Sequence, residues 1–599
     1  MILVFGGTTE GRVAAQVCDQ SGKEFYYSTL SDMQDVPMRH GKRLVGAMTS
    51  DDIIRFCKDR GVRLIVDASH PFAEALHRSV AASGMPVVRY QRRYDVSNQS
   101  SRDIVWCSSY DELVDQLNHS GPRRLLALSG VNTIGKLKDY WRSHETFFRI
   151  LPRQESLARA SAWGFPESKL VFYNPSGALP TFEEELALMR EVRCDAIVTK
   201  ESGDSGGFEA KVRAASELGL QIFVLKAPNY LDYFSCKDCC QTVAGMHGLR
   251  RAIERAVPDF FPLHTGLTTG TVATAAVKAA TLALMEGVEY DEVDVELPDS
   301  EVITVAVDSV RTVEEGGHRW AEASVLKDFS DDPDVTRGCR ITARVELIPG
   351  RHEGIRFLRG EGVGVVTLPG LGLKVGEAAI NPVPRRMMSE IVKSISDMDA
   401  NISVFVENGR EIARRTFNER VGVRDGISII GTSGIVYPLS NEAFIESIGR
   451  ELQVARAIGC DAVGLVSGKQ GEDALRADNP ELRVVHYGNF IGDALRRCES
   501  LGFRRVTVGI MIGKAVKLAE GHLNTHSHQV TMNKTFLTRV AASAGVEHAE
   551  AIVNKITLAR ELWELMPPAF FESLRSLCLM HCRQVFPSGE LEVKLIKNR

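Results

Sequence analysis

Ile2-Leu3-Val4-Phe5-Gly6-Gly7-Thr8-Thr9-Glu10-Gly11-Arg12 is the stretch that decides the fold of the first part of the chain. Ile2–Phe5 is a short apolar run typical of a buried strand, and Val13–Val17 has the apolar spacing of a helix. Gly6 and Gly7 allow a sharp turn close to a ligand. The first N–H groups of the helix favour a phosphate there. Because the spacing departs from G-x-G-x-x-G, a purely structural turn is the alternative.

Strand and helix patterns alternate along residues 1–245. Short apolar runs recur at Leu64–Val66, Leu125–Leu128, Ala196–Val198 and Ile222–Leu225. Helical patterns such as Glu74–Ser83 and Ala210–Leu218 lie between them. Strands separated by helices predict parallel sheet with both faces covered. Since this is a long segment for one sheet, we expect a module over 1–248 with two lobes, at about 1–98 and 99–248, and a cleft.

The pattern changes after a closing helix and linker at 249–263, where Pro258 and Pro262 interrupt the chain. In the second module, 264–599, the strands Val302–Val307 and Ile341–Leu347 follow each other without helices between them. Alternating α/β texture returns near Gly431. The predicted fold is therefore α/β and multi-domain: a two-lobed Rossmann-like parallel-sheet module precedes a mixed α+β and α/β module.

The bulk composition is that of a globular protein, with 44% hydrophobic and 25% charged residues among 599. The net charge of -5 argues against a general nucleic-acid or membrane-surface binder. No apolar run approaches the roughly 20 residues that cross a bilayer, and the N-terminus is typical of a strand rather than a signal peptide. Twelve cysteines without a regular framework indicate reduced thiols and a cytoplasmic protein. The sequence leaves open whether the protein forms a homo-oligomer.

Several stretches of the first module carry a resemblance. Besides Gly6–Arg12 they are Val66–Ala73, Val88–Tyr90, Arg149–Pro152 and Thr199–Lys211. In this order they resemble the precorrin-6A reductase family over nearly all of 1–230. The resemblance implies hydride transfer from NADPH or NADH to a ring carbon of a corrin precursor, with the protein holding donor and acceptor in register.

The resemblance also implies site residues. The cofactor-binding set is Gly6, Gly7, Thr8, Thr9, Glu10, Gly11, Arg12, Lys200 and Gly206. Ser69 and Arg89 are expected to bind substrate, and His70 to donate a proton or hydrogen bond to the ring. The alternative for His70 is that it caps the following helix. The nicotinamide preference stays open, because Asp32 suits a ribose hydroxyl whereas the nearby Arg39, Lys42 and Arg43 suit a 2′-phosphate.

The second module opens with Thr265–Thr271 before the small-residue helix Ala273–Ala280. On its own this is either an anion-accepting turn or a well-capped packing helix. Seven stretches together resemble the cobalt-precorrin-5B (C1)-methyltransferase family over 265–590: Thr265–Lys278, Leu326–Thr336, Gly360–Gly364, Gly376–Arg385, Ile430–Val436, Gly513–Ala519 and Asn524–Ser527. Val272 stands where relatives often have Cys, so a thiol at that point is not essential here.

The resemblance implies S-adenosylmethionine as methyl donor. Gly360–Gly364 imitates a methyltransferase glycine loop, but the strand-like Val365–Pro369 follows instead of a helix. A hairpin turn or a glycine surface under a flat ligand is expected there. The better donor site is Gly431, Thr432, Ser433 and Gly434, which follow the apolar run Ile427–Ile430.

The substrate of this family is rich in carboxylates, which favours arginine and lysine at its rim. The expected substrate-binding residues are Thr268, Thr269, Arg385, Lys514, Asn524 and Thr525, with His526 catalytic. Further candidate cations are Arg92, Arg93, Arg386 and Lys517.

No metal site is predicted, although three patterns invite one. His522, His526 and His528 offer few ligands for a closed site, and hydrogen bonding to substrate or an ordinary loop fits better. Cys236, Cys239 and Cys240 lack a second pair, which favours thiols over zinc. A further acidic group departs from the calcium-loop pattern and indicates a structured turn: Asp328, Asp331, Asp332 and Asp334.

These observations favour a bifunctional enzyme acting on small corrinoids: methylation at C1 of cobalt-precorrin-5B, then reduction of the product. Joining the steps in one chain would raise the local concentration of the intermediate. Two alternatives stay open. One is a nucleotide-dependent dehydrogenase fused to an unrelated domain, and the other is a tetrapyrrole-binding scaffold with one inactive half.

Overall fold

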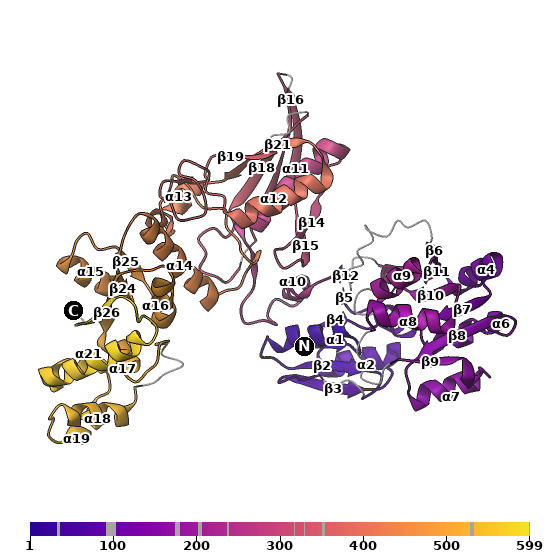
Figure 1. Cartoon of the computed structure of the whole chain (residues 1–599), viewed down its shortest axis with the longest axis horizontal. Coiled ribbons are helices and arrows are strands. Elements are labelled where there is room, and N and C mark those ends of the chain that lie inside the picture. Colours follow the sequence, from indigo (N-terminus) through magenta and orange to yellow (C-terminus); the bar gives the residue numbers. More distant parts are fainter. Residues whose placement is uncertain are drawn as a thin grey trace. The chain divides into compact units, whose positions relative to one another are not determined.

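The computed structural model describes residues 1–32, 36–91, 104–173, 180–201, 207–236, 239–316, 318–328, 330–349, 354–526 and 532–597. The chain forms two compact units, Met1–Pro262 with Glu301–Ile303, and Leu263–Ser300 with Thr304–Arg599 (Figure 1). Within the described ranges, no helix is both long and apolar enough to cross a bilayer.

The first lobe is built on a parallel six-stranded sheet in the order β12-β5-β4-β1-β2-β3. Its strands are β1 (Ile2–Phe5), β2 (Phe25–Thr29), β3 (Gly41–Val45), β4 (Leu64–Asp67), β5 (Val87–Tyr90) and β12 (Cys240–Val243). Its helices are α1 (Thr9–Asp19), α2 (Ser50–Arg60), α3 (Glu74–Ala82) and α10 (Met246–Ala256). β1 has the bounds predicted from its apolar run.

Alternation along β1 shows why both faces of this sheet are covered. Ile2 and Val4 pack in one apolar cluster with residues of α1 and α10. Leu3 and Phe5 point the other way, into a cluster with residues of α2 and α3. Successive side chains of a strand point to opposite faces, so a continuous apolar run predicts helices on both sides.

The second lobe repeats this design with the strand order β6-β11-β10-β7-β8-β9, again all parallel. Its strands are β6 (Ile104–Cys107), β7 (Arg124–Ala127), β8 (Glu145–Ile150), β9 (Leu170–Phe172), β10 (Ala196–Lys200) and β11 (Gln221–Leu225). Its helices are α4 (Tyr110–Ser120), α5 (Asn132–Lys136), α6 (Lys138–Trp141), α7 (Gln154–Ala162), α8 (Phe182–Val192) and α9 (Phe208–Glu217), with the 3-10 turn η1 (Glu167–Lys169).

The expected lobe division at 99–248 differs from the structure, because the chain returns to the first sheet after β11. The 3-10 turn η3 (Tyr230–Tyr233) packs in the first lobe, and β12 pairs with β5. The closing helix predicted from Leu249 onward is α10, and its residues Leu249 and Ile253 are buried in the first lobe's core. The return was missed because pairing partners far apart in sequence leave no local signal.

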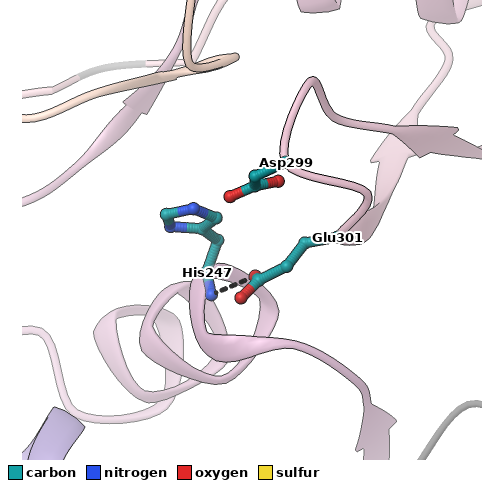
Figure 2. A group of neighbouring side chains, drawn as sticks. All are labelled: His247, Asp299 and Glu301. Carbon is teal, nitrogen blue, oxygen red and sulfur yellow. Dashed lines mark hydrogen bonds between the residues drawn. The ribbon is translucent and has the colours of Figure 1, made fainter.

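Glu301 closes the start of α10, and both belong to the first unit. Its carboxylate accepts the backbone N–H of His247 at 2.8 Å (Figure 2) and that of Met246, also at 2.8 Å. A carboxylate at a helix N-terminus satisfies N–H groups that have no partner within the helix and complements the helix dipole. Glu301 therefore stabilises the N-terminus of α10, the last helix of the first unit.

The second unit begins with the buried helix α11 (Thr269–Glu286), which packs with α12 (Pro382–Ile395) and on a five-stranded sheet in the order β16-β17-β18-β21-β19. That sheet comprises β16 (Ser309–Glu315), β17 (His318–Leu326), β18 (Arg340–Ile348), β19 (Ile355–Arg359) and β21 (Asp399–Val406), antiparallel except for β19 with β21. Short elements are β13 (Gly266–Leu267), β14 (Glu292–Glu296), β15 (Val302–Ala306), β20 (Val365–Val366), β22 (Val423–Arg424), β23 (Ile435–Val436), α13 (Gly409–Ala413) and η5 (Asn418–Val421).

The last part of the chain is a parallel α/β layer with the strand order β25-β24-β26-β27. Its strands are β24 (Ala462–Val466), β25 (Val484–His486), β26 (Arg505–Met511) and β27 (Glu590–Ile596). Its helices are α14 (Asn441–Ala457), α15 (Lys469–Asp478), α16 (Ile491–Ser500), α17 (Ile512–Ala519), α18 (Lys534–Ser543), α19 (Ala549–Lys555), α20 (Leu562–Leu565) and α21 (Pro568–Arg583), with the 3-10 turn η6 (Ala559–Glu561). The predicted parallel α/β first part and mixed second part are thus confirmed.

Candidate active sites

The turn at Gly6–Arg12 joins β1 to α1 and is fastened on both sides. Thr8 is the N-cap: its Oγ1 accepts the Gly11 N–H at 3.0 Å and donates to the Ala68 carbonyl at 2.7 Å. The Gly7 N–H donates to the Tyr27 hydroxyl at 3.2 Å. A Cβ on Gly6 would lie 2.2 Å from that hydroxyl, so only glycine fits.

This turn lies where the strand order of the first sheet reverses. The chain passes from β1 to β2 on one side, whereas β4 pairs on the other side, with Phe5 opposite Asp67. In open parallel sheets, ligands bind at the carboxyl ends of the strands at such a reversal. Thr9 and Arg12 are exposed there, whereas Glu10 is half-buried. Further along this edge, Asp32 forms an ion pair of 3.2 Å with Arg43.

A buried polar network stands at the end of β4. Asp67 Oδ1 accepts the Ser69 hydroxyl at 2.6 Å and Nη1 of Arg89 at 3.0 Å. Its Oδ2 accepts the Tyr230 hydroxyl at 2.6 Å. His77 Nε2 lies 3.2 Å from the Ser69 Oγ. Burial alone would raise the pKa of Asp67, but Arg89 and His77 hold it below its usual range.

This network corrects the expectation that Ser69 and Arg89 bind substrate. Both side chains are buried, and Arg89 also donates to the Asp67 carbonyl at 3.1 Å. Their physical role is to hold the loop that follows β4. Sequence reasoning missed Asp67, His77 and Tyr230, although a carboxylate ending an apolar strand was a usable signal, because such a group needs a partner.

His70 lies on the loop held by this network, and it is exposed. Its Nδ1 accepts the Phe72 N–H at 3.2 Å, whereas α3 begins after Ala73 without a side-chain cap. The alternative that His70 caps α3 is therefore wrong. Lys200, at the end of β10, has its Nζ 4.9 Å from the centre of the Phe72 ring. Gly206 lies outside the described residues, as do Arg92 and Arg93.

In the second unit, the two glycine-containing turns predicted as ligand sites fold against each other. Thr268 is the N-cap of α11, and its Oγ1 accepts a hydrogen bond from the Thr271 N–H at 3.2 Å. Thr269 Oγ1 accepts the Ile430 N–H at 2.8 Å, and Thr271 Oγ1 donates to the Gly434 carbonyl at 2.8 Å. The buried Thr269 and Thr271 hydroxyls thus hold these two turns together, which fits the alternative of a well-capped packing helix for α11.

A pocket of about 310 Å³ opens beside this junction. Of the four residues predicted as the donor site, Gly431 and Thr432 line it. Ser433 donates to the Ile435 carbonyl at 2.8 Å, and a Cβ on Gly434 would lie 2.6 Å from Leu297. The remaining lining residues are Gly370, Leu371, Gly372, Asn381, Pro382, Val383, Pro384, Glu446, Arg450 and Gln453.

Arg385 comes directly after the lining residue Pro384 in α12, but its guanidinium contacts other protein groups. It donates to the carbonyls of Ile380 at 2.8 Å and Ala378 at 3.1 Å, and it pairs with Glu377 at 3.0 Å. These contacts fix the segment before α12. The expected role of Arg385 in binding substrate is therefore not supported by its surroundings.

The glycines of Gly360–Gly364 also face protein. A Cβ on Gly360 would lie 2.1 Å from the Val404 carbonyl oxygen, and one on Gly362 would lie 2.0 Å from that of Val406. These residues let backbones approach closely and offer no open glycine surface to a flat ligand. The strand β20 follows, as the sequence predicted.

A third group of predicted residues meets at the carboxyl ends of β25 and β26. Lys514 donates to the Gly488 carbonyl, and Lys517 donates to that of Thr525 at 3.2 Å. Burial, together with the neighbouring Lys517, lowers the pKa of Lys514 to about 8. The strand order reverses between β24 and β26, so this edge is also a place where ligands bind in parallel sheets.

The segment Asn524–His526 borders this edge. Thr525 is buried, and its N–H donates to the Asn489 carbonyl at 3.0 Å. Asn524 Oδ1 accepts the His526 N–H at 3.2 Å. His528 lies outside the described residues. Among the residues that are described, neither His522 nor His526 belongs to a close group of metal-ligand side chains.

The four aspartates form a structured turn, as expected. Asp328 accepts the Leu267 N–H at 2.8 Å, Asp331 the His264 N–H at 2.7 Å and Asp332 the Leu439 N–H at 3.1 Å. Asp334 pairs with the buried Lys327 at 2.9 Å. They fasten the start of α11 and the approach to α14.

Comparisons with known proteins agree with this division. The family described as precorrin-6x reductase CbiJ/CobK matches residues 1–247, and the family described as CbiD matches residues 258–438. The cobalt-precorrin-5B C(1)-methyltransferase of Prosthecochloris aestuarii is 42% identical over 349 residues, which cover 56% of this chain and 94% of that protein. That of a Geobacillus species is 38% identical over 347 residues, covering 56% and 93%.

Two solved structures are also similar. The CobK precorrin-6A reductase has 21% identity and a TM-score of 0.34, covering 43% of this chain and 97% of that one. The cobalamin biosynthesis protein cbiD of Archaeoglobus fulgidus has 28% identity and a TM-score of 0.24, covering 42% and 78%.

Proposed function

Since the chain belongs to the family of cobalt-precorrin-5B C(1)-methyltransferases and carries a precorrin-6x reductase domain in front of that part, it is a bifunctional enzyme of cobalamin biosynthesis, and we propose one reaction for each unit. The second unit methylates C1 of cobalt-precorrin-5B to give cobalt-precorrin-6A. The first unit then reduces the 6A compound to the 6B form. Reduced thiols support a cytoplasmic location, and no disulfide forms among the described residues.

For methyl transfer, we infer that the donor S-adenosylmethionine binds in the pocket beside Gly431 and Thr432. The volume of about 310 Å³ is that of a small-molecule site, and charged side chains line one wall. When bound, the donor supplies an already activated methyl group, so the protein needs placement more than a nucleophile. Gly431 keeps the wall close to α11, because a Cβ there would lie 2.2 Å from Thr268 Oγ1.

The substrate's carboxylates are assigned to the edge beside β26. Lys514 and Lys517 supply positive charge there, and the carbonyls that they contact orient them. Asn524 holds the backbone of His526, which we propose as the residue that contacts the reacting ring. The hydroxyl of Thr525 points to the Asn489 carbonyl at 3.4 Å, so Thr525 supports the loop.

For the reduction, we infer a Rossmann-like site with NADPH or NADH at the turn Gly6–Arg12. The strand order of the first sheet is that of dinucleotide-binding folds, and a Cβ on Gly7 would face open space. When bound, the cofactor supplies hydride. His70 is exposed on the loop after β4, the strand that pairs with β1. Because its Nδ1 accepts a hydrogen bond, a neutral imidazole carries its proton on Nε2, which suits donation to the ring.

Two observations support the proposal. Each unit matches the family of its proposed reaction. In the first unit the turn Gly6–Arg12 lies where the strand order reverses, and in the second unit Gly431 and Thr432 line a pocket. The test is incubation of the full chain with cobalt-precorrin-5B, S-adenosylmethionine and NADPH, followed by mass spectrometry. We expect one methyl group gained and then two hydrogens.

Omitting NADPH should stop the reaction after methylation, and omitting S-adenosylmethionine should prevent both changes. His70→Ala should block only the second step, and His526→Ala only the first. An unaltered tetrapyrrole with everything supplied would refute the proposal.

A further inference from the structure

Two charged side chains of α14 line the pocket beside Gly431. Arg450 donates to Glu446 Oε1 at 2.6 Å, and Thr432, which also lines the pocket, donates to Glu446 Oε2 at 3.2 Å. The Arg450 and Glu446 side chains are 26% and 42% exposed, so they are accessible to a ligand while partly shielded from bulk water. The pair therefore presents one positive and one negative group side by side to the pocket.

A helical ion pair four residues apart is common and contributes little on an open surface. Two features separate this pair from that case. Both residues line the same pocket, and Glu446 is also hydrogen-bonded to Thr432, another lining residue. Arg456, on the same helix, instead pairs with Asp461 at 2.6 Å and does not line the pocket.

We propose that Glu446 and Arg450 recognise the methionine moiety of S-adenosylmethionine, with Glu446 binding its α-ammonium group and Arg450 its α-carboxylate. This rests on the proposed placement of the donor in this pocket. The guanidinium fork matches a carboxylate, and the carboxylate matches an ammonium. Because the two protein charges already neighbour each other, the zwitterion can align beside them with opposite charges facing and little reordering.

The remaining lining fits the uncharged part of such a ligand. Leu371, Val383 and Pro384 are apolar, and Gly370 packs closely on α14, where a Cβ would lie 2.9 Å from the Val454 Cα. Small-molecule sites usually combine an apolar lining with a few placed polar groups. The charged pair is thus the feature that selects an amino-acid-bearing nucleoside over a plain nucleoside.

The test compares two ligands by calorimetry on the full chain. S-adenosylhomocysteine carries both charged groups, whereas 5′-methylthioadenosine carries neither. Arg450→Met should weaken S-adenosylhomocysteine by about 10- to 100-fold, the usual effect of losing a charge-assisted hydrogen bond. Binding of 5′-methylthioadenosine should be unchanged. Glu446→Gln, which keeps the shape, should act in the same selective way.

Two control variants separate this proposal from the donor-site proposal. Arg456→Met should change neither affinity, and Gln453→Trp, which fills the pocket, should abolish both. If Gln453→Trp leaves both ligands bound, the donor lies elsewhere and both proposals fall. Suppose instead that Gln453→Trp abolishes binding of both ligands, but Arg450→Met and Glu446→Gln weaken both ligands equally or neither. Then the pair does not recognise the charged methionine groups, and only this inference is overturned.

Discussion

Arg149 and Glu185 form a two-pronged ion pair inside the second lobe. Nη1 lies 2.9 Å from Oε2, and Nη2 lies 2.7 Å from Oε1. The two side chains are only 3% and 0% exposed. Since Arg149 belongs to β8 and Glu185 to α8, the pair joins a helix to the sheet. Arg149–Pro152, one of the stretches behind the family resemblance, thus begins with a structural residue.

Glu185→Ala should destabilise the first unit strongly, because it leaves a buried guanidinium without its partner. Loss of one member of a buried pair costs about 3–5 kcal/mol. Urea unfolding followed by reductase activity should report the loss, while methyltransferase activity serves as an internal reference. Glu183→Ala, an exposed change on the same helix, is the matched control. Equal losses in the two variants would contradict the role of the pair.

Asp67→Asn should slow the reduction while sparing methylation. Without the carboxylate, Arg89 is buried without charge compensation, and the loop that carries His70 loses its anchor. A displacement of about 1 Å near reacting groups can cost on the order of 100-fold in rate. The measurement is kcat and KM for the 6A substrate, with the exposed Asp59→Asn as control. An unchanged kcat would argue that the network serves only folding.

The stability of the first unit should fall on mild acidification. Burial lowers the pKa of His77 to about 4, whereas an unfolded histidine titrates near 6.5. Between these values the unfolded chain binds a proton that the folded chain does not, so stability decreases by up to about 1.4 kcal/mol per pH unit as pH falls. Urea midpoints from pH 7 to 4 test this. His77→Asn should flatten the slope, and an unaltered slope would exclude His77 as its source.

Substrate binding to the second unit should weaken as pH rises through about 8. Burial and Lys517 lower the pKa of Lys514 to about 8, so its charge is lost there and with it the attraction to a carboxylate. The measurement is the KM for cobalt-precorrin-5B between pH 7 and 9. Lys514→Arg should remove the dependence, because guanidinium stays charged. A rise in KM that persists in this variant would assign the effect to another group.

Local pattern was enough for much of the fold. The apolar run Ile2–Phe5 predicted β1, and the proline-ended strand after Gly364 predicted that no helix follows. The return of β12 to the first sheet was beyond such reasoning, because its partner β5 lies far away in the chain. Periodicity identifies an element, whereas strand pairing depends on tertiary packing.

The candidate site residues were likewise predicted only in part. Gly431 and Thr432, predicted as a donor site, line a pocket, and Lys517 donates to the carbonyl of Thr525; that these residues bind ligands stays a prediction. Arg89 misled the sequence reasoning because arginine is usually exposed, so its burial against Asp67 could not be foreseen. A charged side chain shows its chemistry in the sequence, but whether it faces ligand or protein depends on what packs around it.

The position of β12 has a consequence for synthesis. The first five strands of the first sheet leave the ribosome early, but the sixth follows only after the whole second lobe has been made. Until then, β5 presents an uncovered edge that can pair with other chains. The nascent protein therefore passes through an aggregation-sensitive stage that ends when β12 and α10 emerge, and crowded translation should expose it as a loss of yield.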